Sequence, residues 1–479
     1  MKKKQIILAC ALFLLCQSML ASDWPTVLLP SISSTKSYNI VDYGASTTSS
    51  DNAADIQKAL DACKNDGGGK VIIPTGTFLS GPVIMGSNTE LYISEGAVLQ
   101  PLAYGTYPMT ASGSNQYPDF ISAASNSSNL IIDGTGTIYG NGSAWWAAYD
   151  AATTKFKRGA LIRLNKCSKI LISDITLKDA PGSHITIGSG GNSNNATIRH
   201  ITIDTKVPSH NTDGIDIWGP HVDIDNCSIS DGDDNVAIDR ESQYIRITNC
   251  NFGYGHGTSV GSYTSNVKHV LIDNCTYKNT DNGIRLKSNA DRGGSEEDFV
   301  FSNLTMTNVK SLVYIDCYYD KEYTTPAKDE ANAKAVTSTT PSFKNILFRN
   351  ITGTSSYNKN NAIFIYGRPE QHVKNITFDN VQLTAPMGAV INFADSVVFK
   401  NGSSITPQSG NSIYSKYAAD ITWETTGITQ VGTSSATVIG DKAVYDVSGK
   451  KVLNDYTYID SLPKAIYIIG NKKVIGGNR

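Results

Sequence analysis

The chain has 479 residues, of which 40% are hydrophobic and 18% charged, and its formal net charge is −2. The hydrophobic fraction is too high for a disordered chain, and a near-neutral chain offers no polybasic case for nucleic acid. With 41 Gly, only 16 Pro and 38 Asn beside many short Ile and Val runs, the composition indicates a protein made mostly of strands and turns.

The N-terminal segment, residues 1–22, has the pattern of a secretory signal peptide. Three lysines precede an apolar stretch from Ile6 to Leu15, and small residues follow at Ala21 and Ser22. The stretch is too short to span a membrane, and no other segment approaches that length. We therefore expect residues 1–22 to be removed with their three lysines, which changes the formal charge from −2 to −5. The protein would be exported to the periplasm, the cell surface or the medium of a bacterium.

A short amphipathic helix is predicted near the start of the mature chain. Ile56, Ala59, Leu60 and Cys63 are spaced as one apolar helix face, and the glycines at 67–69 end the run. We expect this helix to cover the open end of the repetitive fold that follows.

A pattern of apolar residues around an Asn recurs through the middle of the chain. It occurs as Ile224-Asp-Asn-Cys, Ile247-Thr-Asn-Cys, Ile272-Asp-Asn-Cys, Phe301-Ser-Asn-Leu, Phe348-Arg-Asn-Ile and Phe378-Asp-Asn-Val. These Asn stand at positions 226, 249, 274, 303, 350 and 380, so the steps between them are 23, 25, 29, 47 and 30, and we interpret the 47 as two turns. Such periods with β-branched residues predict a solenoid. Because a leucine framework is missing, a right-handed parallel β-helix fits better than a leucine-rich repeat.

In such a fold, equivalent positions of successive turns lie one strand spacing apart, about 4.8 Å. The Asn residues would then stack in a ladder. The cysteines that follow three of them, Cys227, Cys250 and Cys275, would form an interior column of buried free thiols, not disulfides.

The turn pattern fades near residue 425. Residues 426–438 are rich in Gly, Thr and Ser, which predicts a linker. Residues 439–479 contain two short strand-like segments and are expected to form a small β module. The predicted organisation is thus a signal peptide over 1–22, an all-β parallel β-helix over 23–425, the linker and the module.

The same period brings polar side chains into register. Positions 213, 234, 256 and 285 are separated by steps of 21, 22 and 29, and they hold Asp213, Asp234, His256 and Arg285. Asp233 adjoins the second of these acids, and Lys287 follows Arg285 at the next position but one, on the same strand face. We therefore predict one patch in which three acids, a His and two cations meet.

These residue types suit the hydrolysis of an acidic sugar polymer. A glycosidase needs one carboxylic acid to protonate the leaving oxygen and one carboxylate to activate water or attack the sugar. Neighbouring carboxylates raise the pKa of one of them, so that it can stay protonated. Arg and Lys suit a substrate that bears carboxylates of its own.

Taken singly, each of these motifs is more often structural. We expect turn or ladder roles for Asp216, Asp231 and Asp239, and satisfied structural roles for the histidines other than His256. An acidic trio could also bind calcium. Their register on consecutive turns is what favours a site.

With these residues the chain resembles the family 28 glycoside hydrolases, the polygalacturonases. It carries the family's four motifs in order, Asn211-Thr-Asp, Gly232-Asp-Asp, Gly255-His-Gly and Arg285-Leu-Lys, within a likeness that runs from about residue 38 to 400. The resemblance implies a right-handed parallel β-helix and cleavage of α-1,4-galacturonosidic bonds with inversion. We expect neither a metal nor another cofactor.

Carried over by position, the resemblance implies four catalytic and four substrate-binding residues. The catalytic set is Asp213, Asp233, Asp234 and His256. The substrate-binding set is Asn211, Arg285, Lys287 and Tyr319. Asp233 is the implied general acid, and Asp213 and Asp234 hold and deprotonate the attacking water. His256 would tune the acid's protonation or help place the substrate, and the two cations would bind the galacturonate carboxylate.

Three positions depart from the family pattern and leave subsite detail open. His210 stands where Pro often precedes the first motif, Asn235 where Cys often follows the acid pair, and Cys317 where Gln is usual. The motifs at His256 and Arg285 favour galacturonate over the rhamnogalacturonan-cleaving branch.

Other activities stay open at this point. They are a rhamnogalacturonan-active or other pectin hydrolase of the same fold, a calcium-dependent pectate lyase, and a non-catalytic glycan-binding solenoid. The polar insert Asp320 to Ser342 would favour exo over endo action by closing one end of the cleft. We expect an acidic polysaccharide as partner, a monomer in solution, and a C-terminal tail similar to the secretion and sorting modules of Bacteroidetes proteins.

Overall fold

The computed structural model describes residues 24–109, 116–153, 157–319 and 333–424, together with four strands between Val444 and Gly476. The predicted signal peptide and linker lie outside these residues. The chain divides into two compact units, Met1–Glu424 and Thr425–Arg479.

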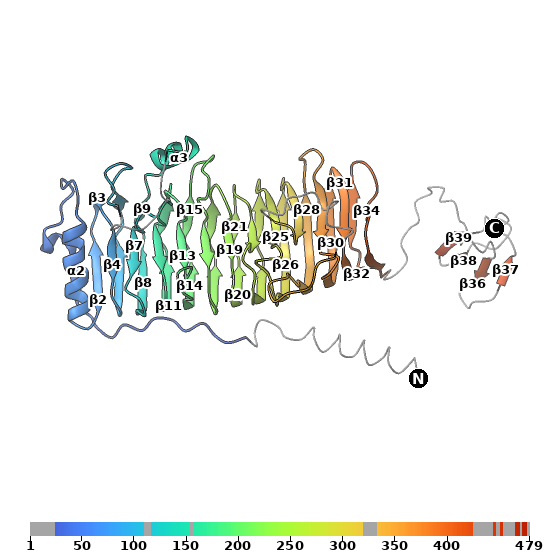
Figure 1. Ribbon diagram of the computed structural model, residues 1–479, viewed down its shortest axis with the longest axis horizontal. Coiled ribbons are helices and arrows are strands. Elements are labelled where there is room, and N and C mark those ends of the chain that lie inside the picture. The colour runs from blue at the N-terminus through green and yellow to red at the C-terminus, as the bar shows by residue number, and fades with distance from the viewer. Residues whose placement is uncertain are drawn as a thin grey trace. The chain divides into compact units, whose positions relative to one another are not determined.

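The first unit is a solenoid whose short strands stack into three parallel columns (Figure 1). Most turns contribute one strand to each column, so neighbours within a column come from successive turns. The first column contains β1 (Ser37–Asn39), β2 (Gly69–Ile73), β5 (Thr89–Ile93), β8 (Ser128–Gly134), β11 (Ser168–Ser173), β14 (Asn194–Arg199), β17 (Val222–Asp225), β20 (Gln243–Thr248), β23 (Lys268–Asp273), β26 (Glu297–Thr307), β28 (Lys344–Thr354), β30 (Val373–Ala385), β32 (Ala394–Lys400) and β35 (Ala419–Trp423).

Most strands of the second column are shorter than those of the first. The two columns merge towards the C-terminal end, where β26, β28 and β30 each run through both. Its other strands are β3 (Gly76–Ser80), β6 (Ala97–Pro101), β9 (Thr137–Tyr139), β12 (Thr176–Lys178), β15 (Thr202–Asp204), β18 (Ser228–Ser230), β21 (Asn251–Phe252), β24 (Thr276–Lys278) and β33 (Ser404–Pro407).

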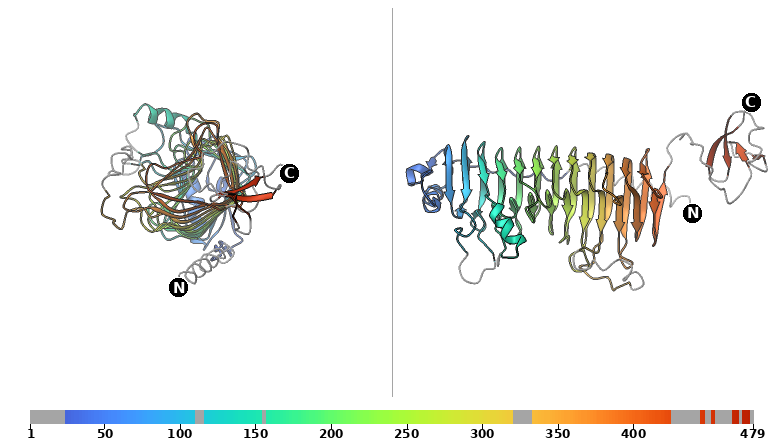
Figure 2. Two further views of the ribbon diagram at one scale, coloured as in Figure 1. Left: turned by 90° about the vertical axis from the view of Figure 1, so that its right-hand side faces the viewer. Right: turned by 90° about the horizontal axis from the view of Figure 1, so that it is seen from above.

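The third column is a separate sheet, and it carries the polar residues of interest. Its strands are β4 (Val83–Met85), β7 (Ile121–Ala123), β10 (Ile162–Leu164), β13 (Ile185–Ile187), β16 (Ile215–Ile217), β19 (Val236–Ile238), β22 (Thr258–Val260), β25 (Asn282–Lys287), β27 (Ser311–Asp316), β29 (Asn361–Tyr366), β31 (Met387–Asn392) and β34 (Ile413–Tyr414). Viewed along the solenoid axis, the columns enclose a common interior (Figure 2). Parallel strands joined by such crossovers wind right-handedly, and the predicted right-handed parallel β-helix is confirmed.

Rows of equivalent residues fill the interior. Ile224, Ile247 and Ile272 pair in register, and the row continues with Phe301 and Phe348. All five are buried, and the two phenylalanine rings stack with their centroids 5.1 Å apart. Since each such side chain contributes about 1.5–3 kcal/mol on burial, these rows supply much of the stability of the solenoid.

The predicted Asn ladder is confirmed for three of its five steps, while Asn249 and Asn303 donate instead to Asp225 and Asp273 of the preceding turn. Asn274 donates to Asn249, Asn350 to Asn303 and Asn380 to Asn350, with amide N···O distances of 2.7, 3.0 and 3.0 Å. Each of these residues has a positive φ between 52° and 56°. Asn tolerates this left-handed backbone better than other non-glycine residues, which explains its recurrence at this corner.

The interpretation of the step of 47 as two turns is wrong. Phe301 of β26 pairs directly with Phe348 of β28, so positions 303 and 350 belong to adjacent turns. The additional residues lie between the end of β27 and the start of β28. A loop at a corner adds residues without adding a strand, and spacing alone does not distinguish the two cases.

The six cysteines of the described residues are free and buried. Cys227, Cys250 and Cys275 follow the Asn corner, and the backbone N–H of Cys250 donates to the Sγ of Cys275 at 3.4 Å. The predicted interior column of thiols is thus confirmed.

The N-terminal end of the solenoid is covered by α2 (Ala53–Asn65), at the left end of Figure 1. Its buried residues are Ile56, Ala59, Leu60 and Cys63, the predicted face. The short η2 (Ile40–Tyr43) precedes it, and α3 (Ser143–Asp150) lies outside the columns. Among the described residues, no helix has the length and apolar character needed to cross a membrane.

The second unit contains an antiparallel four-stranded sheet. Its strands are β36 (Val444–Asp446), β37 (Lys451–Leu453), β38 (Ala465–Ile469) and β39 (Lys472–Gly476), paired in the order β37-β36-β38-β39.

The ladder can be tested at Asn350 with two substitutions. Asn350→Ala is expected to lower the free energy of unfolding by about 3–4 kcal/mol, because a left-handed Ala costs about 1–2 kcal/mol and two hydrogen bonds of about 1 kcal/mol each are lost. Asn350→Gly loses the same bonds without backbone strain and should cost about half as much. Denaturant unfolding of both variants checks this, and equal losses would contradict a role for the backbone conformation.

Candidate active site

The predicted acids and His256 lie along one edge of the third column, and the two predicted cations lie on its strand β25. Asp213 precedes β16, Asp233 and Asp234 precede β19, and His256 precedes β22. These strands are neighbours in register, with Ile215 opposite Val236 and Val236 opposite Thr258. The steps of 21 residues from Asp213 to Asp234 and 22 residues from Asp234 to His256 therefore place these side chains on three consecutive turns.

Asp234 is the buried centre of the cluster, with a side chain only 3% exposed. Its Oδ2 accepts a hydrogen bond from Lys287 Nζ at 2.6 Å, and its Oδ1 accepts one from Ser259 Oγ at 2.7 Å. Arg285 Nη1 lies 3.3 Å from Oδ1. Two cations from β25 thus neutralise this carboxylate.

The Asp233 carboxylate contacts His256 and Asn211. His256 Nδ1 lies 2.9 Å from Asp233 Oδ1, and the backbone and side-chain N–H groups of Asn211 donate to Oδ2 at 3.2 Å. Burial raises the pKa of Asp233, but His256, followed by the charge of Lys287, outweighs burial and lowers it to about 2. In return, Asp233 and Asp234 raise the pKa of His256 against the effect of its burial.

The pKa of Asp213 is shifted in the opposite direction to that of Asp233. Burial, with the charges of Asp216, Asp233 and Asp234, raises its pKa well above the usual range, although Lys287 opposes the shift. Among the described residues, none donates a hydrogen bond to the Asp213 carboxyl. The cluster therefore combines a carboxyl whose pKa is raised, Asp213, with one whose pKa is lowered, Asp233.

The local sequence explains how His256 is presented. Gly255 and Gly257 have φ values of 126° and 79°, and a Cβ at either would collide with neighbouring atoms. Between them and the acids lies the buried Asn235, which donates to the carbonyl of Tyr254 at 2.8 Å and accepts from the N–H of Gly257 at 3.0 Å. Asn235, one of the departures from the family pattern, thus ties the two loops together.

The remaining predicted residues complete the patch. The Tyr319 ring lies under both cations, with the Arg285 guanidinium 5.3 Å and the Lys287 nitrogen 5.0 Å from its centroid. Two of the three acids expected in turn or ladder roles serve loops: Asp231 accepts from the N–H of Asp233, and Asp239 from the N–H of Tyr263. The third, Asp216, lies on β16 and accepts a hydrogen bond at 3.2 Å from Thr186 on the neighbouring strand. Cys317 is fully buried away from solvent.

Sequence reasoning missed two residues of the site. Arg158 donates to the carbonyl of His210 at 2.7 Å and lies 3.3 Å from Asn211 Oδ1, which turns the amide nitrogen of Asn211 towards Asp233. Asp281 lies 3.9 Å from His256 Nε2 and pairs with Lys310. Neither residue belongs to the repeat pattern, so spacing offered no signal for them.

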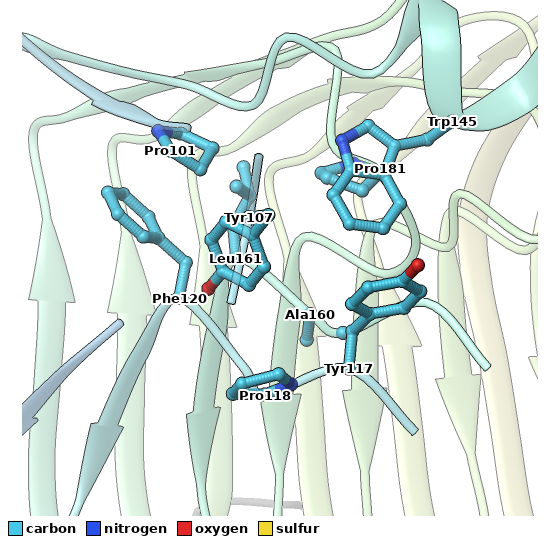
Figure 3. Close-up of a pocket in the computed structure, with 10 residues that line it drawn as sticks. Pro101, Tyr107, Tyr117, Pro118, Phe120, Trp145, Ala160, Leu161 and Pro181 are labelled. Carbon is cyan, nitrogen blue, oxygen red and sulfur yellow. The ribbon is translucent and has the colours of Figure 1, made fainter. Parts of the chain in front are cut away.

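An aromatic cluster around α3 supports Arg158. Trp145 packs edge-on against Tyr104, Tyr107 and Tyr117 with centroid distances of 5.0, 5.7 and 4.7 Å, and Figure 3 shows its indole beside the rings of Tyr107 and Tyr117. The cavity that Trp145, Tyr107 and Tyr117 help to line holds about 10 Å³, too small for a sugar ring. At the C-terminal end of α3, the ring of Tyr149 lies 4.2 Å from the Arg158 guanidinium.

A metal ion fits this site poorly. Ligand atoms of Asp233, Asp234 and His256 lie within 4.8 Å of one another. However, Lys287 and Arg285 already compensate the charge of Asp234, and calcium requires six to eight oxygen ligands. A further cation would be repelled by both.

The pairing of Lys287 with Asp234 can be tested by a double-mutant cycle. Lys287→Met is expected to lower the free energy of unfolding by about 2–3 kcal/mol, because it leaves a buried carboxylate with only the longer Arg285 ion pair and the hydrogen bond from Ser259. Adding Asp234→Asn should restore much of this loss. Chemical denaturation of the two single variants and the double variant measures the coupling, and additive losses would contradict it.

Comparisons with known proteins place this geometry in a family. The model for "Glycosyl hydrolases family 28" matches residues 63–399. An endo-polygalacturonase of Pectobacterium carotovorum subsp. carotovorum is 32% identical over 400 residues, covering 77% of this chain and 91% of that protein. An exopolygalacturonase of Platanus acerifolia is 30% identical over 333 residues, covering 67% and 83%. The solved polygalacturonase of Erwinia carotovora ssp. carotovora aligns with a TM-score of 0.63 at 28% identity, covering 78% and 99%. The chain belongs to the glycosyl hydrolases of family 28.

Proposed function

We propose that the enzyme hydrolyses α-1,4-galacturonosidic bonds of polygalacturonate with inversion of configuration. The observation that carries this proposal is the pairing of Asp233 with His256 beside an Asp234 that is held by Lys287 and Arg285. Relatives that align over two thirds or more of this chain are named polygalacturonases, which supports the same substrate class.

In this mechanism Asp233 is the general acid, and His256 supplies its proton. The pair holds one proton, which rests on His256 in the free enzyme because the pKa of Asp233 is low and that of His256 is raised. As the glycosidic bond breaks, the leaving oxygen gains negative charge. The proton then passes from His256 through Asp233 to that oxygen, and the pair becomes neutral His256 and ionised Asp233.

Water attacks the sugar from the opposite face, with Asp213 and Asp234 as its ligands. Asp234 is fixed by three donors and can accept a hydrogen bond from the water without moving. The proton that the water releases is taken up by this carboxyl pair. Because the water replaces the leaving group directly, configuration at the sugar carbon inverts.

Arg285 and Lys287 would bind the carboxylate of the galacturonate at the cleavage site. Each uses only part of its donor capacity on Asp234, and Tyr319 beneath them offers a ring face to the sugar. The same two cations disfavour the calcium-dependent lyase, which would need a metal on the acids that they occupy.

Several predictions from the sequence stay proposals. Export rests on the pattern of residues 1–22, which lie outside the described residues, as do 320–332 of the insert that favours exo action. A monomeric state and a sorting role for the C-terminal tail are likewise proposed from the sequence.

Asp233→Asn should abolish most of the hydrolysis. We expect a loss of about 10²–10⁴-fold in the release of reducing ends from polygalacturonate, because the amide cannot donate the required proton. Asp204→Asn is the matched control, since Asp204 lies on the second column with a side chain 63% exposed. Equal activity of Asp233→Asn and wild type would refute the acid assignment. Products absorbing in the ultraviolet would indicate a lyase, and product sizes in a short digest separate endo from exo cleavage.

The pH dependence of kcat/KM tests the role of His256. In the wild type the pair keeps its proton below the raised pKa of His256, so activity should fall as pH rises through that value. In His256→Gln the proton must reside on Asp233 itself, a carboxyl, so the alkaline limb should move to lower pH. An unchanged alkaline limb in the variant would show that His256 does not hold the proton.

A further inference from the structure

The loops that follow the strands of the third column carry alternating aromatic and cationic side chains. On five consecutive turns these are, in order, Trp218 after β16, Arg240 after β19, Tyr263 after β22, Arg292 after β25 and Tyr319 after β27. We call the first four the aromatic–arginine wall. They stand at the opposite strand ends from Asp213, Asp233 and His256.

Members of the wall contact one another in sequence along the solenoid. The Arg240 guanidinium lies 5.4 Å from the ring centroid of Trp218 and 5.8 Å from that of Tyr263. Arg292 lies 4.6 Å from the same Tyr263 ring and donates to Ser262 Oγ at 2.6 Å. These contacts hold the guanidinium groups in place before any ligand arrives.

Within the described ranges, Arg240 contacts aromatic rings and no acid. It is exposed, and among the described residues no Asp or Glu forms an ion pair with it. The neighbouring Asp239 is buried and accepts the N–H of Tyr263 instead. An exposed guanidinium held between two aromatic rings, with its charge uncompensated, is suited to bind a carboxylate.

The wall is close to the proposed site of cleavage. β19 has only three residues, so Asp234 and Arg240 lie at its two ends, at most about 20 Å apart. Tyr319, the next member of the same series, already touches Arg285 and Lys287. A sugar chain lying along the third column would thus pass both the acids and the wall.

We propose that the aromatic–arginine wall binds unesterified galacturonate residues that neighbour the one being cleaved. The guanidinium of Arg240 pairs with a carboxylate, and the rings of Trp218 and Tyr263 pack against sugar faces. Successive turns are about 4.8 Å apart, so the wall meets a chain at repeated points along its length. This inference rests on the proposed function.

The experiment measures kcat/KM of wild type and Arg240→Ala on unesterified oligogalacturonates of increasing length. Loss of one charge-assisted pair should lower kcat/KM about tenfold or more on long oligomers, and much less on the shortest oligomer that the enzyme cleaves. Arg240→Lys should retain part of the effect. On chains whose carboxylates are methyl-esterified, wild type and Arg240→Ala should differ little.

Arg246→Ala is the matched control, because Arg246 lies over Trp24 at the same 5.4 Å but on the first column. It should not change the length dependence. Calorimetric binding of a long oligogalacturonate in the Asp233→Asn background adds a readout independent of turnover. If wild type cleaves galacturonan but Arg240→Ala matches it at every length, the wall proposal is wrong. If wild type cleaves no galacturonan at all, the proposed function fails first.

Discussion

In-register stacking of successive turns is the constraint on which the rest of this molecule depends. Hydrogen bonds between equivalent strand positions hold each turn about 4.8 Å from the next, whatever length of chain lies between them. A corner can therefore carry a tight bend or a long insert without shifting the strands. The site shows this freedom: the corner that carries Asp213 has ten residues between β15 and β16, the corner that carries Asp233 and Asp234 has five between β18 and β19, and the strands that follow still pair in register.

Electrostatics within the cluster follow from where each carboxyl stands in that stack. Asp234 is neutralised by two cations that β25 contributes from two turns further along the solenoid, whereas Asp213 meets mainly other acids. Asp233 lies between these extremes, against an imidazole. Three aspartates within a few turns thus experience three different environments, and each environment is set by the residues that the next turns bring alongside.

The sequence predicted what repeats and missed what does not. The Asn ladder, the thiol column and the register of Asp213 with His256 follow from the repeat, and the capping helix follows from the helical spacing of its own apolar face. The step of 47 residues was wrongly interpreted as two turns because sequence spacing does not show whether additional residues form a strand or lie at a corner. Arg158 was out of reach for another reason: it enters from a loop anchored by aromatic packing around Trp145, a long-range contact that leaves no periodic trace.

The buried thiols have a consequence for how the molecule can be observed. Among the described residues no covalent cross-link joins the turns, so reducing surroundings leave the cohesion of the solenoid unaffected, and its strength is that of packing and hydrogen bonding alone. The cysteines, spread from the capping helix to the turn after β27, are hidden from reagents as long as their own turns stay closed. The reaction of each cysteine with a thiol reagent therefore reports the opening of its own turn. The order in which the cysteines react gives the order in which the turns of the solenoid open.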